Sequence, residues 1–125
     1  MNIVISNKID APIYEQIKDQ IRSAIIRDEI AENELLPSIR SLAHELKISV
    51  ITTKRAYDEL EAEGYIATVQ GKGCFVLPKN KEQIRERKLK EIEQHLSEAI
   101  TNAKLIHMDN DELVKVLKIL LEEEQ

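Results

Sequence analysis

Residues 49–55 of the chain, SVITTKR, combine the side-chain types that bind phosphate groups and nucleobase edges. Ser49 and Thr52 supply hydroxyl groups, and Lys54 and Arg55 supply cations about one helical turn later. Small hydroxyls and the backbone N–H groups at a helix N-terminus are suited to phosphate oxygens. Lysine and arginine at this distance can reach further phosphates or the edge of a guanine. The pattern therefore favours binding to a nucleic acid.

Two apolar residues, Val50 and Ile51, interrupt this polar segment. At the start of a helix that reads DNA, they could lie against the methyl groups of thymine. Alternatively, they are ordinary β-branched residues on a helix surface, or the preceding turn partly covers them. The sequence leaves both interpretations open.

Arg40 is a further candidate, because it follows Pro37 and Ser38 in the first turn of the preceding predicted helix. A lone surface arginine would more often pair with an acid such as Glu45. Its place beside the turn, on the same side as Ser49, favours a DNA contact instead.

The tip of a predicted hairpin adds three more candidates, Gln70, Gly71 and Lys72. A glycine lets the backbone approach a groove closely, and a lysine supplies charge. Taken alone, such a tip is more often only a turn, so its interpretation depends on the helix that precedes it. The predicted DNA-binding residues are Ser38, Arg40, Ser49, Val50, Ile51, Thr52, Lys54, Arg55, Gln70, Gly71 and Lys72.

The elements that would position these residues are two short helices and a hairpin. The first helix should begin at the cap Ser38 and bury Ile39, Leu42, Ala43 and Leu46, and the chain should break at residues 47–49. The second should begin at Ser49, end before Gly64, and bury one stripe formed by Thr53, Ala56, Tyr57 and Leu60. Strands at 65–69 and 74–76 should follow. A helix-turn-helix with a small wing is a fold that lays its second helix in the major groove.

Before this region, Asp10 and Pro12 predict the start of a helix, with Asp10 as the capping acid, that continues to about Arg27. An acidic connection at residues 28–36 should follow it.

After the boundary at Leu77–Lys81 the pattern becomes helical. Apolar residues recur every three or four positions, and Asp109 predicts the cap of a last helix. A helical hairpin on its own would leave its apolar stripe in water, which favours pairing with a second copy, although the tail could also fold back on its own domain. The predicted dimerisation residues are Leu89, Ile92, Leu96, Ala99, Ala103, Leu113, Leu117, Leu120 and Leu121.

The fold class expected is mostly α with a small β-hairpin, with a winged helix-turn-helix domain at 1–77 and a dimerisation tail at 78–125.

Composition limits the other possibilities. The 125-residue chain carries a formal net charge of −5, yet residues 38–56 hold four cations against one acid. The single cysteine, Cys74, and the lack of an apolar run of about 20 residues favour a reducing cytoplasm and no membrane partner. We expect no cofactor and no enzyme activity, because the histidines are far apart and no phosphate-binding glycine loop occurs. A metal site at His107, Asp109 and Asp111 is a weaker interpretation than a helix cap at Asp109.

Several short motifs occur together between Ala11 and Val76. They are PIY at 12–14, QI at 16–17, LPSxRxLA at 36–43, SxxT at 49–52, RAYxxL at 55–60, EG at 63–64 and QGxGxFV at 70–76. This combination resembles the DNA-binding domain of the GntR family of bacterial transcription regulators. The resemblance implies that Arg40, the segment from Ser49 to Lys54 and the wing glycine contact operator DNA. The short tail is similar to that of the YtrA-like subfamily, where it serves dimerisation.

Two positions depart from that family. Val50 stands where an arginine is common, and Lys47 stands where a glycine is usual. The first departure removes an expected guanine contact and so affects which operator sequence is preferred.

The function expected from the sequence is that of a homodimeric, sequence-specific DNA-binding transcription regulator, a repressor, on a palindromic operator. The alternative is a winged-helix protein-interaction module, which Val50 and Ile51 favour. A small effector is a further possible partner, with the cleft between the domain and the tail as the place to look.

Overall fold

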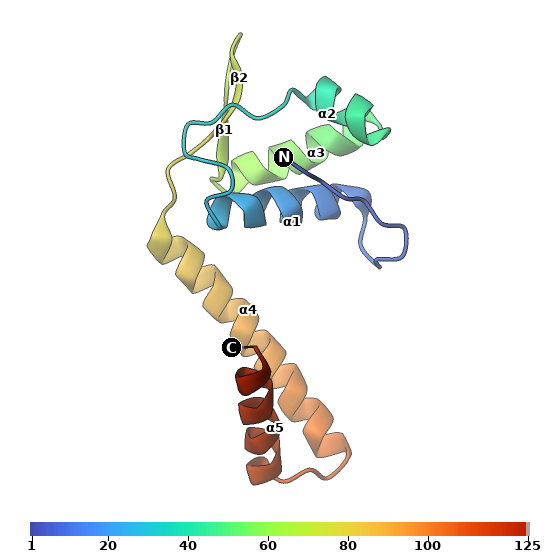
Figure 1. Ribbon diagram of the computed structural model, residues 1–125, viewed down its shortest axis with the longest axis vertical. Helices are drawn as coiled ribbons and strands as arrows, with labels where there is room; N and C mark the ends of the chain where they lie inside the picture. Colours follow the sequence, from blue (N-terminus) through green and yellow to red (C-terminus); the bar gives the residue numbers. More distant parts are fainter. Residues whose placement is uncertain (125) are drawn as a thin grey trace. The chain divides into compact units, whose positions relative to one another are not determined.

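The computed structural model describes residues 1–124, which are mostly helical and include one β-hairpin (Figure 1). This confirms the expected fold class. The chain divides into two compact units, Met1–Lys79 and the residues from Asn80 on. In chain order the elements are α1 (Ile13–Ile26), α2 (Ile39–Leu46), α3 (Val50–Ala62), β1 (Ile66–Val69), β2 (Gly73–Val76), α4 (Lys81–Leu105) and α5 (Asn110–Glu123).

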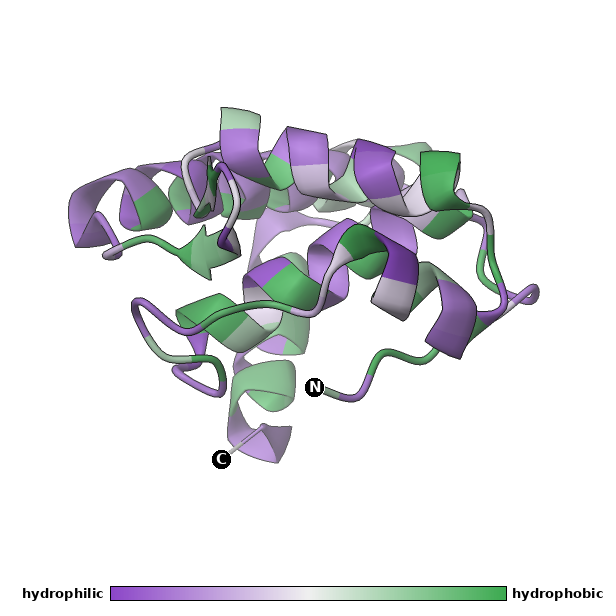
Figure 2. Cartoon of the chain, turned by 90° about the horizontal axis from the view of Figure 1, so that it is seen from above, coloured by the Kyte–Doolittle hydropathy of each residue, from purple (hydrophilic) through white to green (hydrophobic). Residues whose placement is uncertain are grey.

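The core of the first unit lies between α1 and α3. The predicted stripe of α3 is confirmed, since Thr53, Ala56, Tyr57 and Leu60 are all buried. Apolar and polar residues alternate along the helices, as expected of amphipathic helices (Figure 2). The stripe of α1 that packs against this core contains Ile17, Ile21 and Ile25.

The start of α1 differs from the prediction, because its N-cap is Pro12 and not Asp10. The first helical hydrogen bond runs from the Gln16 N–H to the Pro12 carbonyl at 3.1 Å, which leaves Asp10 two residues upstream of the cap. Gln16 itself is buried, and its amide bonds the backbone of Ser6 and Ala11 at 2.9 Å. A side chain that sequence periodicity does not select thus holds the N-terminal arm against α1.

The acidic connection after α1 pairs with the wing. The Asn33 N–H donates to the Val76 carbonyl at 2.7 Å, and the Val76 N–H donates to the Glu34 carbonyl at 3.0 Å. The Leu36 N–H reaches the Cys74 carbonyl at 2.9 Å. This pairing holds the segment just before α2 beside β2.

In the hairpin, β1 pairs antiparallel with β2, from Ile66 opposite Val76 to Val69 opposite Gly73. The second strand therefore begins one residue earlier than predicted. Gly73 has a φ of 113°, and an added Cβ would lie 3.0 Å from Cδ1 of Leu35. Glycine is required here both by its backbone conformation and by the close side chain.

In the second unit, the chain reverses between α4 and α5 (Figure 1). The predicted cap of α5 is confirmed, because the Glu112 N–H donates to Oδ1 of Asp109 at 2.8 Å. Asn80 caps α4 in the same way, by accepting from the Gln83 N–H at 3.1 Å. Of the predicted dimerisation residues only Ala103 is buried, Ala99 and Leu113 are half-buried, and those exposed are Leu89, Ile92, Leu96, Leu117, Leu120 and Leu121.

No helix within residues 1–124 is both long enough and apolar enough to span a bilayer.

Candidate nucleic-acid interface

The start of α3 is held by two hydroxyl groups. Oγ of Ser49 accepts from the Thr52 N–H at 3.0 Å, which confirms Ser49 as the cap, and Oγ of Ser49 lies 2.8 Å from Oγ1 of Thr52. Oγ1 of Thr53 donates to the Ser49 carbonyl at 3.1 Å from the buried side. These bonds fix the first turn, where free backbone N–H groups and the positive end of the helix dipole favour anions.

The turn between α2 and α3 depends on an unusual backbone conformation at Lys47, with φ 58° and ψ 44°. This is the left-handed region, where glycine is the least strained residue. It gives a physical reason why glycine is usual at this position in the family that the sequence resembles. The side chain of Lys47 is exposed beside the start of α3 and adds a positive charge there.

Tyr57 connects the buried side of α3 to the start of α2. Its hydroxyl donates to the Pro37 carbonyl at 2.7 Å, one residue before the cap Ser38. Burial raises the pKa of Tyr57 well above its usual value, so the phenol stays a neutral donor. Ser38 in turn accepts from the Ser41 N–H at 3.0 Å, as predicted. The first turn of α2, which carries Arg40, is therefore positioned by the core.

Arg40 and Lys72 are exposed, and neither side chain forms an ion pair or hydrogen bond with another residue in the described part of the chain. The structure therefore does not contain the pairing of Arg40 with Glu45 that the sequence left open. Both cations are available to an external anion. Gln70 and Gly71, beside Lys72 at the hairpin tip, are also exposed.

Lys54 and Arg55 are both 61% exposed, but their surroundings differ. Nζ of Lys54 lies 2.7 Å from Oδ2 of Asp58 one turn later, and this hydrogen bond raises the pKa of Lys54. The Arg55 guanidinium lies over the Tyr14 ring, 3.7 Å from its centroid, and Nε lies 3.3 Å from Oε2 of Glu59. Arg55 is thus drawn toward α1, a contact that the sequence did not reveal.

Glu59 belongs to an ion-pair cluster that joins α1 to α3. Nζ of Lys18 lies 3.0 Å from Oε1 of Glu59 and 3.8 Å from Oε2 of Glu63, and Arg22 lies 3.3 Å from Glu63. The hydrogen bond from Lys18 lowers the pKa of Glu59 below its usual 4.5. The cluster holds the outer edge of α3 in place.

The pH dependence of stability should reflect this pair. Because the pKa of Glu59 is lower in the folded state, its contribution is present above pH 4.5 and is lost as the pH falls below that value. Glu59→Gln should therefore lower the Tm at pH 7, and the difference from the wild type should shrink in acid. Thermal melts followed by circular dichroism from pH 7 to pH 3 would measure this. Glu45→Gln, at an exposed glutamate, is the control. A difference in Tm between Glu59→Gln and the wild type that is the same at every pH would contradict the prediction.

Residues 13–76 match the family model described as "Bacterial regulatory proteins, gntR family". This match spans more than half of the chain and contains α1, α2, α3 and the wing. The chain belongs to the gntR family.

Relatives of this gntR-family chain include the HTH-type transcriptional repressor YtrA of Bacillus subtilis (strain 168). It is 31% identical over 93% of this chain and 89% of its own length. Among solved structures, a transcriptional antiterminator from Listeria monocytogenes EGD-e has a TM-score of 0.75 and 30% identity, covering 100% of this chain and 91% of its own. The DNA-binding domain of AraR in complex with operator ORR3 has a TM-score of 0.52 and 28% identity, covering 61% and 92%. The chain is thus a DNA-binding transcription regulator of the YtrA-like type.

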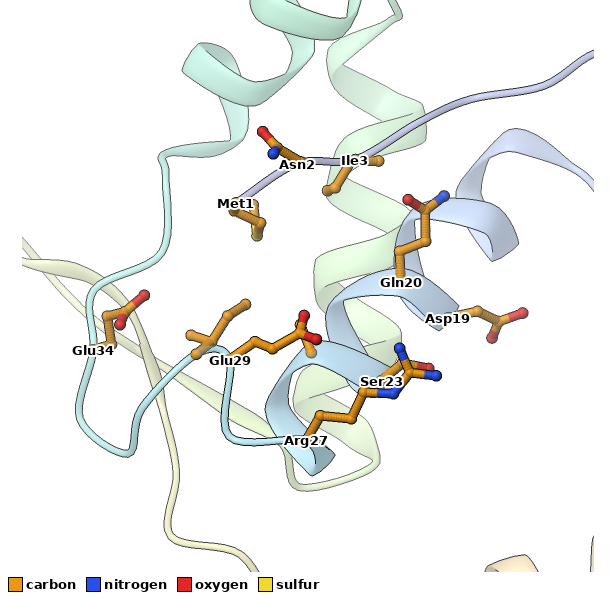
Figure 3. A pocket seen from close by; sticks show the side chains of 11 residues that line it. Met1, Asn2, Ile3, Asp19, Gln20, Ser23, Arg27, Glu29 and Glu34 are labelled. Carbon is orange, nitrogen blue, oxygen red and sulfur yellow. The ribbon is translucent and has the colours of Figure 1, made fainter. Parts of the chain in front are cut away.

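The gntR-family domain also contains a hollow of about 620 Å³ on another part of its surface (Figure 3). The N-terminal arm and the segment after α1 border it, and its charged lining residues are Asp19, Arg27, Glu29 and Glu34. None of the described residues that line it belongs to the predicted DNA-binding set. An effector in a cleft between domain and tail stays a prediction.

Proposed function

We propose that this regulator binds a palindromic operator as a homodimer and represses transcription, acting in the bacterial cytoplasm and without a catalytic step. The observation that carries the DNA-contact part is the exposed, capped start of α3, together with two exposed and unpaired cations, Arg40 in α2 and Lys72 at the wing tip. In this proposal α3 lies in the major groove, and the wing tip meets the adjacent backbone or minor groove.

Charge supports this assignment of the face. The chain as a whole is acidic, with a formal net charge of −5, so a general attraction to DNA is not expected. Arg40 and Lys72 have no internal partner among residues 1–124, and the Lys54–Asp58 pair is an exposed one that contributes little to stability. Lys54 can therefore release the Asp58 carboxylate and bind a DNA phosphate with little loss of free energy.

The tail supports the dimer. Leu96 is 44% exposed and Leu117 is 42% exposed, and most of the apolar side chains around them on α4 and α5 are also exposed. Large apolar patches are rare on monomers, and a two-fold pairing of the tails would cover them. The same symmetry would present two copies of α3 to a palindromic site. Repression is proposed because the relative YtrA of Bacillus subtilis is a transcriptional repressor.

The alternative, a winged helix that binds a protein partner, is favoured by Ile51, which is 81% exposed. Dependence on salt separates the two. If Arg40, Lys54 and Lys72 of both protomers each neutralise one phosphate, log K should fall against log salt concentration with a slope of about −5. Fluorescence anisotropy with an operator selected from random DNA would measure the slope. A chain that selects no DNA sequence, or whose DNA affinity barely responds to salt, would favour the protein-interaction module.

A further inference from the structure

The first turn of α3 exposes two hydrocarbon side chains. Ile51 is 81% exposed and Val50 is 45% exposed, in the first turn after the cap Ser49. The hydroxyls of Ser49 and Thr52 bond each other at 2.8 Å, so much of their own hydrogen-bonding capacity is used within the cap. If this turn of α3 faces DNA, the groups that it presents between Ser49 and Thr52 are mainly apolar.

The position of Ile51 on the helix excludes a core role. It lies three and four residues before Lys54 and Arg55, which places all three on the exposed face of α3. The buried stripe begins at Thr53 on the other side. Val50 precedes Thr53 by three residues and so lies at the edge between the two faces, in agreement with an exposure lower than that of Ile51.

Among the base edges in the major groove, only thymine offers an apolar group, its 5-methyl. An isoleucine cannot form the hydrogen bonds that distinguish guanine or adenine, but it gains free energy by covering a methyl group. Its β-branched side chain is also stiff, so little conformational freedom is lost on contact. Lys54, one turn further on the same face, would contact a phosphate and set the depth of the helix.

We infer that Ile51, with Val50 at its edge, reads thymine through the 5-methyl group, so each operator half-site holds at least one thymine facing the start of α3. The inference rests on the proposed DNA contact of α3 and goes beyond it by naming the base. It makes Ile51 a specificity-determining residue of this chain.

The test uses the full chain and an operator selected from random-sequence DNA. Each thymine of the half-site is replaced in turn by deoxyuridine, which removes one methyl and keeps base pairing. At one or two positions the Kd should rise about fourfold, which corresponds to roughly 0.8 kcal/mol, the value of one buried methylene-sized group.

Ile51→Ala should show a smaller difference in affinity between the thymine and uracil operators than the wild type, because most of the apolar surface that covers the methyl is gone. The matched control is Ile9→Ala, at an isoleucine that is 55% exposed and lies outside α3, and it should keep the fourfold difference. A selected operator in which no uracil changes the Kd, or full discrimination by Ile51→Ala, would overturn the inference and leave the DNA-binding proposal standing. If selection recovers no bound sequence, both are overturned.

Discussion

Leu96→Asp and Leu117→Asp are each expected to convert the protein to monomers and to weaken operator binding by roughly 10²–10⁴-fold. Both leucines are exposed in the single chain, so a charge there should leave each protomer folded. In a two-fold interface the same position occurs twice, and two carboxylates would face each other in an apolar contact. Loss of the second protomer removes bivalent binding to the two half-sites.

Sedimentation velocity would report the oligomeric state, and anisotropy would report the operator affinity. Gln94→Asp is the control, because this position lies on the opposite side of α4 from Leu96. It introduces the same charge and should leave both measurements close to the wild type. Unchanged far-UV circular dichroism would show that α4 and α5 remain helical. Dimers that persist in both leucine variants would refute the tail as the interface.

Arg40→Ala should cost about 1–3 kcal/mol of specific binding, a Kd increase of roughly 5- to 150-fold, if the guanidinium reads a base edge. The effect on binding should be separable from folding, because Arg40 is exposed and its side chain has no ion-pair or hydrogen-bond partner among residues 1–124. Folding stability should therefore remain close to that of the wild type.

Arg27→Ala provides the matched control, since it removes an exposed arginine that borders the hollow beside the N-terminal arm. Arg40→Lys separates two roles. A lysine that restores full affinity would assign Arg40 to a phosphate, whereas a lysine as weak as alanine would assign it to a bidentate base contact. Operator affinity that is the same for Arg40→Ala and the wild type would remove Arg40 from the interface.

Where local patterns predicted the structure, they did so because the cause was local. The caps at Ser38, Ser49 and Asp109 accept from N–H groups three residues away, and the stripe of α3 is defined by helical periodicity alone. The exception is Asp10, since an acid and a proline near a helix start do not show which residue makes the first helical hydrogen bond. The Gln16 N–H bonds the Pro12 carbonyl and so decides it.

The contacts that the sequence did not reveal join residues far apart in the chain. Tyr14 lies under Arg55, which is far from it in the sequence, and the Glu34 carbonyl accepts a hydrogen bond from the Val76 N–H in β2. Neither partner has a pattern that marks the other, because such pairs form only after α1, α3 and the hairpin have packed. The same reason applies to Lys18 and Glu59.

The sequence alone determined the family and the order of the elements. It also determined which residues lie on the exposed face of α3, because spacing along one helix decides which side chains share a face. Only the tertiary structure decided which of these cations are free. Arg40 and Lys72 have no internal partner in the described chain, whereas the packing of α1 against α3 places Arg55 over the Tyr14 ring, in addition to its local pair with Glu59 one turn later on α3. Availability for DNA depends on competition with neighbours in space, and those neighbours exist only in the folded chain.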